Sequence, residues 1–415
     1  HWRAAPSPLC WWPGPAAGSL RWRRRLGRRG LAPAADAAEL LGPEDPAQGE
    51  PVRIGLVSDG QFAAGDRAYE LDIGQAAATY VNEHRGGIGG RPIELVTCVT
   101  EADPAKGTDC GNQMVEEEVV AVVVGSSAVT ASVWEPLHQA GVPVVFYGAS
   151  DATVSTDTES TFALSSPLGG LVDLPIATAE AEGEDKVSVV VVDIPAAVAL
   201  YDSIGPSLFE AQGIDLDVVK VSPGTADMTP QMQQLADGDP GVVHVIGNDV
   251  FCIAAFNGLR SVAFDGPVTT IAQCMTDATV EAVPGDFFEG MRMSATAPVG
   301  TDDPAVALYH AVVDTYADEE PGSETGGISM FTAVAGMAAA LEGISDDITP
   351  ATVISTIKAM PEMELPGSGG LRFRCNGEAI EFAPAVCTRG TLLTTLDASG
   401  APTTYEVVGD TPIED

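Results

Sequence analysis

The sequence predicts an α/β fold built on two doubly wound, mostly parallel sheets. The chain has 415 residues, and because domains usually contain about 100–200 residues, two are expected. From Pro51 onward, short runs of β-branched residues alternate with amphipathic stretches, which is the pattern of successive βαβ units. This alternation starts near Val52 and starts again near Leu171, so each half of the chain is expected to form its own sheet.

The expected elements follow from the spacing of apolar residues. In the first half, strands are expected over residues 52–58, 93–98, 119–125 and 142–148. A helix over about residues 69–85 has one apolar face and ends at Gly86-Gly87, a suitable C-cap. In the second half, strands are expected over residues 186–193, 215–222, 242–247, 268–273 and 290–295. Three consecutive helices over 304–318, 329–344 and 350–360 follow, and a hairpin around Ser399-Gly400 ends the fold.

Composition and motifs exclude several classes of protein. The net charge is −39, from 59 acidic and 20 basic residues, whereas nucleic-acid binding requires clustered Lys and Arg. The body has no run of the roughly 18–20 apolar residues that a membrane helix needs. It has no nucleophile elbow, HExxH motif, phosphate-binding loop or CxxC pair, and its five His are scattered. We therefore expect no enzyme, no metal site, no cofactor and no nucleic-acid partner.

Residues 1–50 are expected to lie outside the fold. They contain four of the five Trp and seven Arg, without periodicity. The run from Arg21 to Gly30 is similar to the basic region of an export signal, but the apolar region that should follow is missing. Either this segment is a damaged or misread export signal, or it is a natural basic extension. We expect residues 1 to about 48 to be disordered or absent from the mature protein.

Six of the seven cysteines form three sequential pairs. The separations are 12, 22 and 12 residues, which favours three disulfides formed in an oxidising compartment. The alternative is buried free thiols in a cytoplasmic protein. The expected pairs are Cys98–Cys110, Cys252–Cys274 and Cys375–Cys387.

Two junctions between strand and helix are candidate binding loops. Gly125, Ser126 and Ser127 open an expected helix after an apolar strand, and Gly148, Ala149 and Ser150 do the same after the next strand. Unpaired N–H groups at a helix start suit a carboxylate or another anion. In open parallel sheets, ligands bind at the carboxyl ends of the strands. The alternative is that these serines are ordinary helix caps.

With these loops in place, the chain resembles the leucine/isoleucine/valine-binding branch of the type I periplasmic binding proteins, over about residues 52–408. The resemblance rests on IGLVSDGQFAAGD, AAATYVNEHRGGIGGRPIELV, the GSS loop, AGVPVVFYGAS and GPVTTIAQCMTDATVEAVPGDFFEGM, in that order. It implies two α/β lobes joined by three hinge segments, expected near Ser165-Ser166, near Thr296-Ala297 and over residues 361–367. Lobe one would comprise residues 51–165 and 298–361, and lobe two residues 166–297 and 362–410.

The resemblance also implies ligand contacts. Ser126, Ser127, Ala149 and Ser150 match the lobe-one loops that hold the α-carboxylate and ammonium of an amino acid. In lobe two the first family aromatic is missing, and Ala196 or Ala197 occupies its place.

The remaining lobe-two positions also depart from the family pattern. Asn248-Asp249 occupies the place of the second aromatic, and Gln273 occupies the place of the acid that anchors the ammonium. The missing acid weakens a simple branched-chain amino acid assignment, although Asp249 could supply a charge.

The sequence thus favours an extracytoplasmic solute-binding protein that delivers an amino acid, or a related carboxylate or amide, to the membrane permease of an ABC importer. The alternatives are a ligand-sensing receptor domain on the same fold and a doubly wound enzyme. A receptor would need a transmembrane or DNA-binding module, and an enzyme would need a nucleotide loop or a nucleophile.

Overall fold

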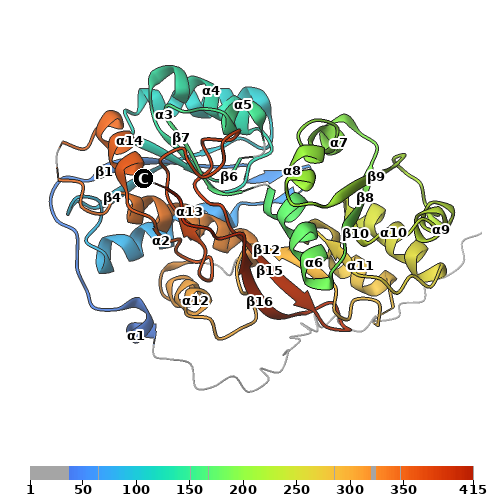
Figure 1. Cartoon of the computed structure of the whole chain (residues 1–415). Helices are drawn as coiled ribbons and strands as arrows, with labels where there is room; N and C mark the ends of the chain where they lie inside the picture. Colours follow the sequence, from blue (N-terminus) through green and yellow to red (C-terminus); the bar gives the residue numbers. More distant parts are fainter. Residues whose placement is uncertain are drawn as a thin grey trace, which may run out of the picture. The chain divides into compact units, whose positions relative to one another are not determined.

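The computed structural model describes residues 37–63, 65–149, 151–166, 168–284, 286–318, 324–345 and 347–414, with only the backbone of Ala196. Ser150 and residues 1–36 lie outside this range, so the expectations for them stay open. The elements are shown in Figure 1.

The first sheet has five parallel strands. Its order is β4-β1-β5-β6-β7, comprising Ile93–Val99, Val52–Ser58, Ala121–Val124, Val144–Gly148 and Thr161–Ser165. Every second residue points to the same face, and alternate residues of β1 accordingly belong to two different apolar clusters, with Leu56 in one and Val57 in the other.

Helices cover both faces of this sheet. The first cluster includes residues of α2 (Tyr69–His84), α12 (Pro304–Tyr316), α13 (Glu324–Ala340) and α14 (Pro350–Ala359). The second includes residues of α3 (Pro104–Glu116), α4 (Thr130–Ala140) and α5 (Ala152–Ser155). The three helices that follow β12 in sequence therefore pack on the first sheet.

The second sheet has seven strands. Its order is β9-β8-β10-β11-β12-β15-β16, comprising Asp215–Val221, Lys186–Val192, Val242–Ile246, Val268–Thr270, Arg292–Ala295, Thr391–Leu396 and Pro402–Val408. The first five are parallel, and β15 and β16 are antiparallel additions.

Helices also cover both faces of the second sheet. One cluster includes residues of α6 (Leu174–Glu182), α7 (Pro195–Asp202) and α8 (Gly205–Ala211), and the other includes residues of α9 (Thr229–Ala236) and α10 (Asp249–Ser261). The remaining elements are short: α11 (Asp277–Ala282), the π-helix Gly169–Asp173, the 3-10 helix Ala272–Cys274, and the two-stranded pairs β2–β3 (Gln61–Phe62, Gly65–Asp66) and β13–β14 (Met363–Glu364, Arg372–Phe373).

The chain passes between the sheets three times, and the third passage differs from the expectation. Residues 385–387 lie beside β7 of the first sheet, where Ala163 N donates to Ala385 O and Cys387 N donates to Ala163 O. The next strand, β15, belongs to the second sheet. The passage therefore lies between Cys387 and Thr391, not over residues 361–367, and the expectation that residues 362–387 belong with the second sheet is wrong.

The expectation that all of residues 1–50 lie outside the fold is wrong for residues 37–50. Helix α1 (Ala37–Leu41) packs against α12, and Leu41 is buried in the first cluster. Backbone hydrogen bonds then tie Asp45 to Glu83 and Ala47 to Asn82. The polar composition of this segment gave no sign of its attachment, which depends on a few apolar side chains of α1 and on hydrogen bonds to its backbone.

Local sequence explains most helix boundaries. Thr349 caps α14 with Pro350 at its first position, as expected, and Asp103 caps α3 before Pro104. Ser329 was expected to open a helix, but it lies inside α13, where its hydroxyl donates to Thr325 O. A hydroxyl that bonds back to the preceding turn fits a helix interior as well as a cap, so its presence does not locate a boundary.

Disulfides join the three cysteine pairs expected from the sequence. The Cα–Cα distances are 5.6 Å for Cys98–Cys110, 5.4 Å for Cys252–Cys274 and 4.5 Å for Cys375–Cys387. The first links β4 to α3, the second links α10 to the 3-10 helix, and the third closes the segment that lies beside β7.

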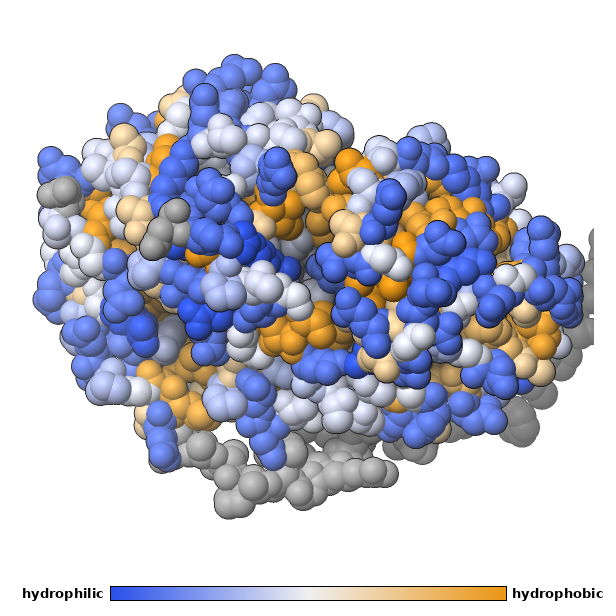
Figure 2. All heavy atoms as spheres, in the orientation of Figure 1, coloured by the Kyte–Doolittle hydropathy of each residue, from blue (hydrophilic) through white to orange (hydrophobic). Residues whose placement is uncertain are grey.

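Hydrophilic residues cover most of the face shown in Figure 2, which agrees with the large excess of acids. Within the residues that the structure describes, no helix is long and apolar enough to span a bilayer. The same residues contain no group of three or more His, Cys, Asp or Glu that could hold a metal ion.

Candidate functional site

Both sheets have a point at which the strand order reverses. In the first sheet it lies between β1 and β5, because the chain adds β4 on one side of β1 and β5 on the other. In the second sheet it lies between β8 and β10 for the same reason. In doubly wound sheets the carboxyl ends of strands at such points are where ligands bind.

The candidate lobe-one residues lie at this edge of the first sheet. Ser126 and Ser127 follow β5, and Ala149 follows the neighbouring strand β6. Both serines are half-buried, and Ala149 is buried. The structure therefore places these three residues along one edge, whereas Ser150 is not described.

The loop after β5 differs in one respect from the sequence prediction. Helix α4 begins only at Thr130, with Val129 in the N-cap position, so Ser126 and Ser127 do not open a helix. They lie in an irregular loop, residues 125–129, which we call the serine loop. The expected anion site at a helix N-terminus is therefore wrong for Ser126 and Ser127, and the partners of the loop must be found elsewhere.

A buried carboxylate, Asp59, takes up much of the serine loop's hydrogen-bonding capacity. It follows β1 directly and has no exposed surface. Its Oδ1 accepts from the hydroxyls of Thr100 (2.7 Å) and Ser127 (3.0 Å). Its Oδ2 accepts from Ala128 N (2.8 Å) and from Arg67 Nη1 (2.9 Å). Four donors satisfy this carboxylate, and two of them hold the serine loop against the end of β1.

A second buried carboxylate, Glu70 of α2, contacts the same loop. Its Oε2 accepts from the Ser58 hydroxyl at 2.6 Å, and its Oε1 accepts from Ser126 N at 3.3 Å. Glu70 has no exposed surface, and burial raises its pKa to about 7, against the opposing effects of the Ser58 hydrogen bond and the Arg67 charge. Asp59 and Glu70 together thus face one guanidinium, so the edge of the first sheet carries more buried negative than positive charge when both are ionised.

Sequence reasoning did not assign a role to these two acids. The signal for Asp59 was present, because it is an acid placed directly after an apolar strand that ends at the edge of a sheet. Glu70 gave no such signal, since it stands at the start of a helix and the body holds many acids. Only the packing of α2 against β1 shows that it is buried.

Glu70 gives a pH dependence to stability. Below about pH 4.5 both folded and unfolded chains hold this proton; as pH rises towards 7 the unfolded chain releases it first, so stability falls. Between about pH 5 and pH 8, this release should lower the free energy of unfolding of the wild type by on the order of 2 kcal/mol. Glu70→Gln resembles the protonated carboxyl and cannot ionise, so we expect it to lack this decrease. Urea unfolding at both pH values measures it. The exposed Glu116→Gln is the control, and pH profiles that run parallel in wild type and Glu70→Gln would contradict the assignment.

The candidate lobe-two residues lie at the carboxyl edge of the second sheet. Ala196 is the second residue of α7, which follows β8, while Asp249 opens α10 after β10. Gln273 lies in the 3-10 helix after β11 and is exposed. Since β8, β10 and β11 are neighbours, the structure brings these three positions to one edge.

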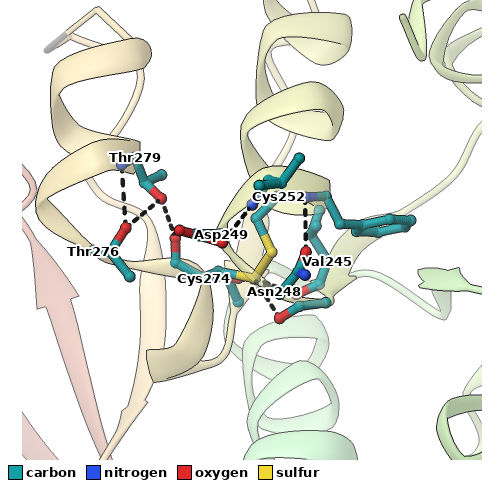
Figure 3. Close-up of a disulfide and its surroundings, with 11 residues drawn as sticks. Val245, Asn248, Asp249, Cys252, Cys274, Thr276 and Thr279 are labelled. Atoms are coloured by element: carbon teal, nitrogen blue, oxygen red, sulfur yellow. Dashed lines mark hydrogen bonds between the residues drawn. A yellow bond between two sulfur atoms is a disulfide. The ribbon is translucent and has the colours of Figure 1, made fainter. Parts of the chain in front are cut away.

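The Cys252–Cys274 disulfide lies between the elements that carry Asp249 and Gln273 (Figure 3). The cap of α10 is Asn248, whose side chain accepts from Phe251 N at 3.0 Å. Asp249 instead accepts from its neighbour Val250 N at 2.8 Å and is partly exposed. Because Asn248 takes the capping position, the other carboxylate oxygen of Asp249 is left for an external donor.

Exposed apolar side chains lie at the same edge. Ile194, just before α7, is 41% exposed, and Val250 in α10 is 67% exposed. Ile194 stands two residues before Ala196, and Val250 directly follows Asp249. This edge therefore offers apolar surface as well as the Asp249 and Gln273 side chains.

Tyr147, near the end of β6, is hydrogen-bonded to hydroxyl-bearing side chains that lie near two of the passages between the sheets. Burial raises its pKa, whereas hydrogen bonds with the side chains of Thr296, Ser165 and Ser329 lower it. Ser165 ends β7 and Thr296 follows β12, so both stand where the chain leaves a sheet. The sequence analysis had not assigned a role to Tyr147.

A cavity lined by residues of α2 and α13 is distinct from the candidate site. A cavity of about 160 Å³ is lined by Tyr80, Phe331, Ala335 and neighbouring residues of these helices. It contains none of the candidate contact residues, and its volume is smaller than the 300–1,000 Å³ usual for small-molecule sites.

Comparison with known proteins agrees with this architecture. The family model described as periplasmic binding protein matches residues 51–386. A curated relative, "Leu/Ile/Val-binding protein homolog 6" of Brucella suis biovar 1, is 27% identical over 223 residues, which cover 51% of this chain and 56% of that relative. The match thus spans little more than half of the relative's length.

Solved structures share the fold. A putative branched-chain amino acid ABC transporter protein from Rhodospirillum rubrum superposes with a TM-score of 0.70 at 18% identity, covering 86% of this chain and 100% of that one. A solute-binding protein from R. palustris, in complex with 4-hydroxybenzoate, gives 0.64 at 18% identity, covering 88% and 98%. The chain therefore belongs to the periplasmic binding protein family and has the type I periplasmic binding fold, two α/β lobes joined by three hinge segments.

Proposed function

We propose that this chain is the extracytoplasmic solute-binding protein of an ABC importer and that it traps a small carboxylate, an amino acid or a related amide, by closing its two lobes. The observation that carries the proposal is the position of the candidate contacts. They stand at the carboxyl edges of both sheets, at both points of strand-order reversal, which is where this architecture binds ligands.

The two lobes are proposed to centre on the two sheets, with the candidate edges facing each other across the ligand. Lobe one would comprise residues 37–165 and 298 to about 388, and lobe two residues 166–297 with the β15–β16 ribbon. Three disulfides support a location outside the cytoplasm, since such bonds persist in oxidising compartments. The partner would be a membrane permease.

In lobe one, the carboxylate or another acceptor of the ligand is proposed to contact the serine loop and the loop at Ala149 and Ser150. Asp59 and Glu70 already accept hydrogen bonds from the Ser127 hydroxyl and from two backbone N–H groups of this loop. The Ser126 hydroxyl is half-buried and makes no hydrogen bond within the described part of the chain. It is therefore the donor best placed to serve a ligand.

In lobe two, Asp249 and Gln273 are proposed to hold the polar end opposite the carboxylate. A partly buried carboxylate benefits from an ammonium or amide N–H, and an amide side chain both donates and accepts.

A thermal-shift screen tests the function. The protein is unfolded, freed of bound molecules and refolded, and then heated with small carboxylates that include isoleucine and 4-hydroxybenzoate. A ligand present at 100 times its Kd should add about 2.7 kcal/mol to the free energy of unfolding. The absence of a shift across amino acids, aromatic acids and fatty acids would contradict the proposal.

Asp249→Asn combined with Gln273→Ala should weaken binding of the tightest hit by at least tenfold, about 1.4 kcal/mol. The reason is that the ligand's donor would lose the negative charge at position 249 and the amide acceptor at position 273. Calorimetry measures the change, and the exposed Glu210→Gln on α8 serves as the control with a similar loss of charge. A change below about 0.5 kcal/mol would place the contact elsewhere in the cleft.

A further inference from the structure

Glu70 lies in a hydrogen-bonded relay that accommodates two protonation states. The Ser58 hydroxyl is 2.6 Å from Glu70 Oε2 and 3.1 Å from the Arg67 carbonyl oxygen. When Glu70 is ionised, Ser58 donates to it. When Glu70 is protonated, its O–H donates to the Ser58 oxygen, and Ser58 turns its own proton to the Arg67 carbonyl. Neither state leaves a buried polar atom unpaired, and no heavy atom has to move.

Of the two buried carboxylates, Asp59 and Glu70, the hydrogen-bond partners favour protonation of Glu70. Asp59 has four donors, one of them a guanidinium, so its oxygens are fully used as acceptors. Glu70 has two donors, and the contact from Ser126 N is long at 3.3 Å. A carboxylate with fewer donors loses less on protonation.

The elements packed around Glu70 supply few charges. Arg67, just before α2, and Asp59, after β1, are the charged groups that act on it. At Gly125 a Cβ atom would lie 3.2 Å from Glu70 Oε1 and 2.8 Å from the Met330 side chain of α13. Serine-loop backbone therefore approaches the carboxylate directly.

We propose that Glu70 takes up a proton when the protein binds a carboxylate ligand at the serine loop, so that affinity for the ligand depends on pH. This inference rests on the proposed function, and it names Glu70 as a positioning residue. Glu70 has no exposed surface and acts through Ser126, which is the residue that would contact the ligand.

The coupling follows from charge. With both acids ionised, two buried negative charges share Arg67, and a ligand carboxylate at the loop would add a third within a poorly solvated region. A proton on Glu70 removes one of these charges and weakens the hydrogen bond from Ser126 N, while the Ser126 hydroxyl donates to the ligand. The pKa near 7 means that this proton is available under physiological conditions.

Calorimetry tests the coupling, with isoleucine and 4-hydroxybenzoate as the probes. Titrations in two buffers of different ionisation enthalpy, from about pH 6 to about pH 8, count the protons taken up. We expect uptake to approach one proton per ligand at the upper end, and Kd to rise by up to about tenfold per pH unit above 7. Glu70→Gln should bind without proton uptake and with a flat pH profile, whereas Glu116→Gln should behave as wild type.

A spectroscopic measurement keeps the test open if Glu70→Gln does not fold. Infrared difference spectra of the unmodified protein at about pH 8 should gain the band of a protonated carboxyl when either probe binds. Binding without proton uptake or without this band would overturn the inference and leave the proposed function intact. If neither these probes nor any other carboxylate of the thermal-shift screen binds at any pH, the proposed carboxylate class fails, and the inference fails with it.

Discussion

Replacing Asp59 with alanine is expected to lower the free energy of unfolding by about 3–5 kcal/mol, because it removes a fully buried carboxylate that accepts four hydrogen bonds, one of them from the partly exposed Arg67. Thr100, Ser127 and Ala128 would also lose their acceptor, and Thr100 is fully buried. Since two of these donors belong to the serine loop, ligand affinity should fall together with stability. Urea denaturation with a constant m-value measures the first effect, and calorimetry measures the second.

Two variants sharpen this test. Asp59→Asn keeps the shape and one acceptor oxygen, so we expect it to lose less stability than Asp59→Ala. Asp109→Ala removes an exposed acid from α3 and should leave both measurements within about 0.5 kcal/mol of wild type. If Asp59→Ala unfolds no more easily than Asp109→Ala, the Asp59 network does not stabilise the loop.

Removal of a disulfide should have an effect of similar size. Closing loops of 12 to 22 residues is worth about 3 kcal/mol each in the chain-entropy model, so full reduction should cost roughly 9 kcal/mol. That loss is comparable to the whole stability of a typical domain. We expect the reduced protein to be largely unfolded at 37 °C, as is common for disulfide-bonded exported proteins.

The Cys252–Cys274 bond should differ from the other two in its effect on binding. It joins the start of α10, with Asp249, to the 3-10 helix with Gln273, so Cys252→Ala with Cys274→Ala should weaken ligand binding as well as stability. The matching double variants at Cys98–Cys110 and Cys375–Cys387 should reduce stability alone. Equal ligand affinity in all three would show that the disulfide does not position Asp249 and Gln273.

The alternation of β-branched and amphipathic segments was sufficient to predict both sheets apart from β7 (Thr161–Ser165), because parallel strands buried on both faces read as runs of Val and Ile. It failed where backbone contacts decide the structure. Residues 385–387 lie beside β7 through two main-chain hydrogen bonds, and residues 45–47 attach to the end of α2 in the same way. Neither segment has the side-chain periodicity from which a strand is recognised.

The positions of the candidate site residues were predictable from the sequence, but their hydrogen-bond partners were not. Strand ends locate Ser126, Ala149 and Asp249, since a parallel sheet brings carboxyl ends to one edge. The partner of the serine loop was not predictable, because Glu70 is separated from Ser126 by 56 residues and its burial arises from helix packing. Polar residues whose role depends on long-range burial carry no local signature.

Small-angle X-ray scattering during a ligand titration tests the central claim most directly, namely that two lobes close on one small molecule. The refolded, ligand-free protein is titrated with the tightest carboxylate from the thermal-shift screen. The radius of gyration should decrease and reach a plateau at one ligand per chain. A radius of gyration that stays constant while calorimetry shows saturation would contradict closure of the lobes on the ligand.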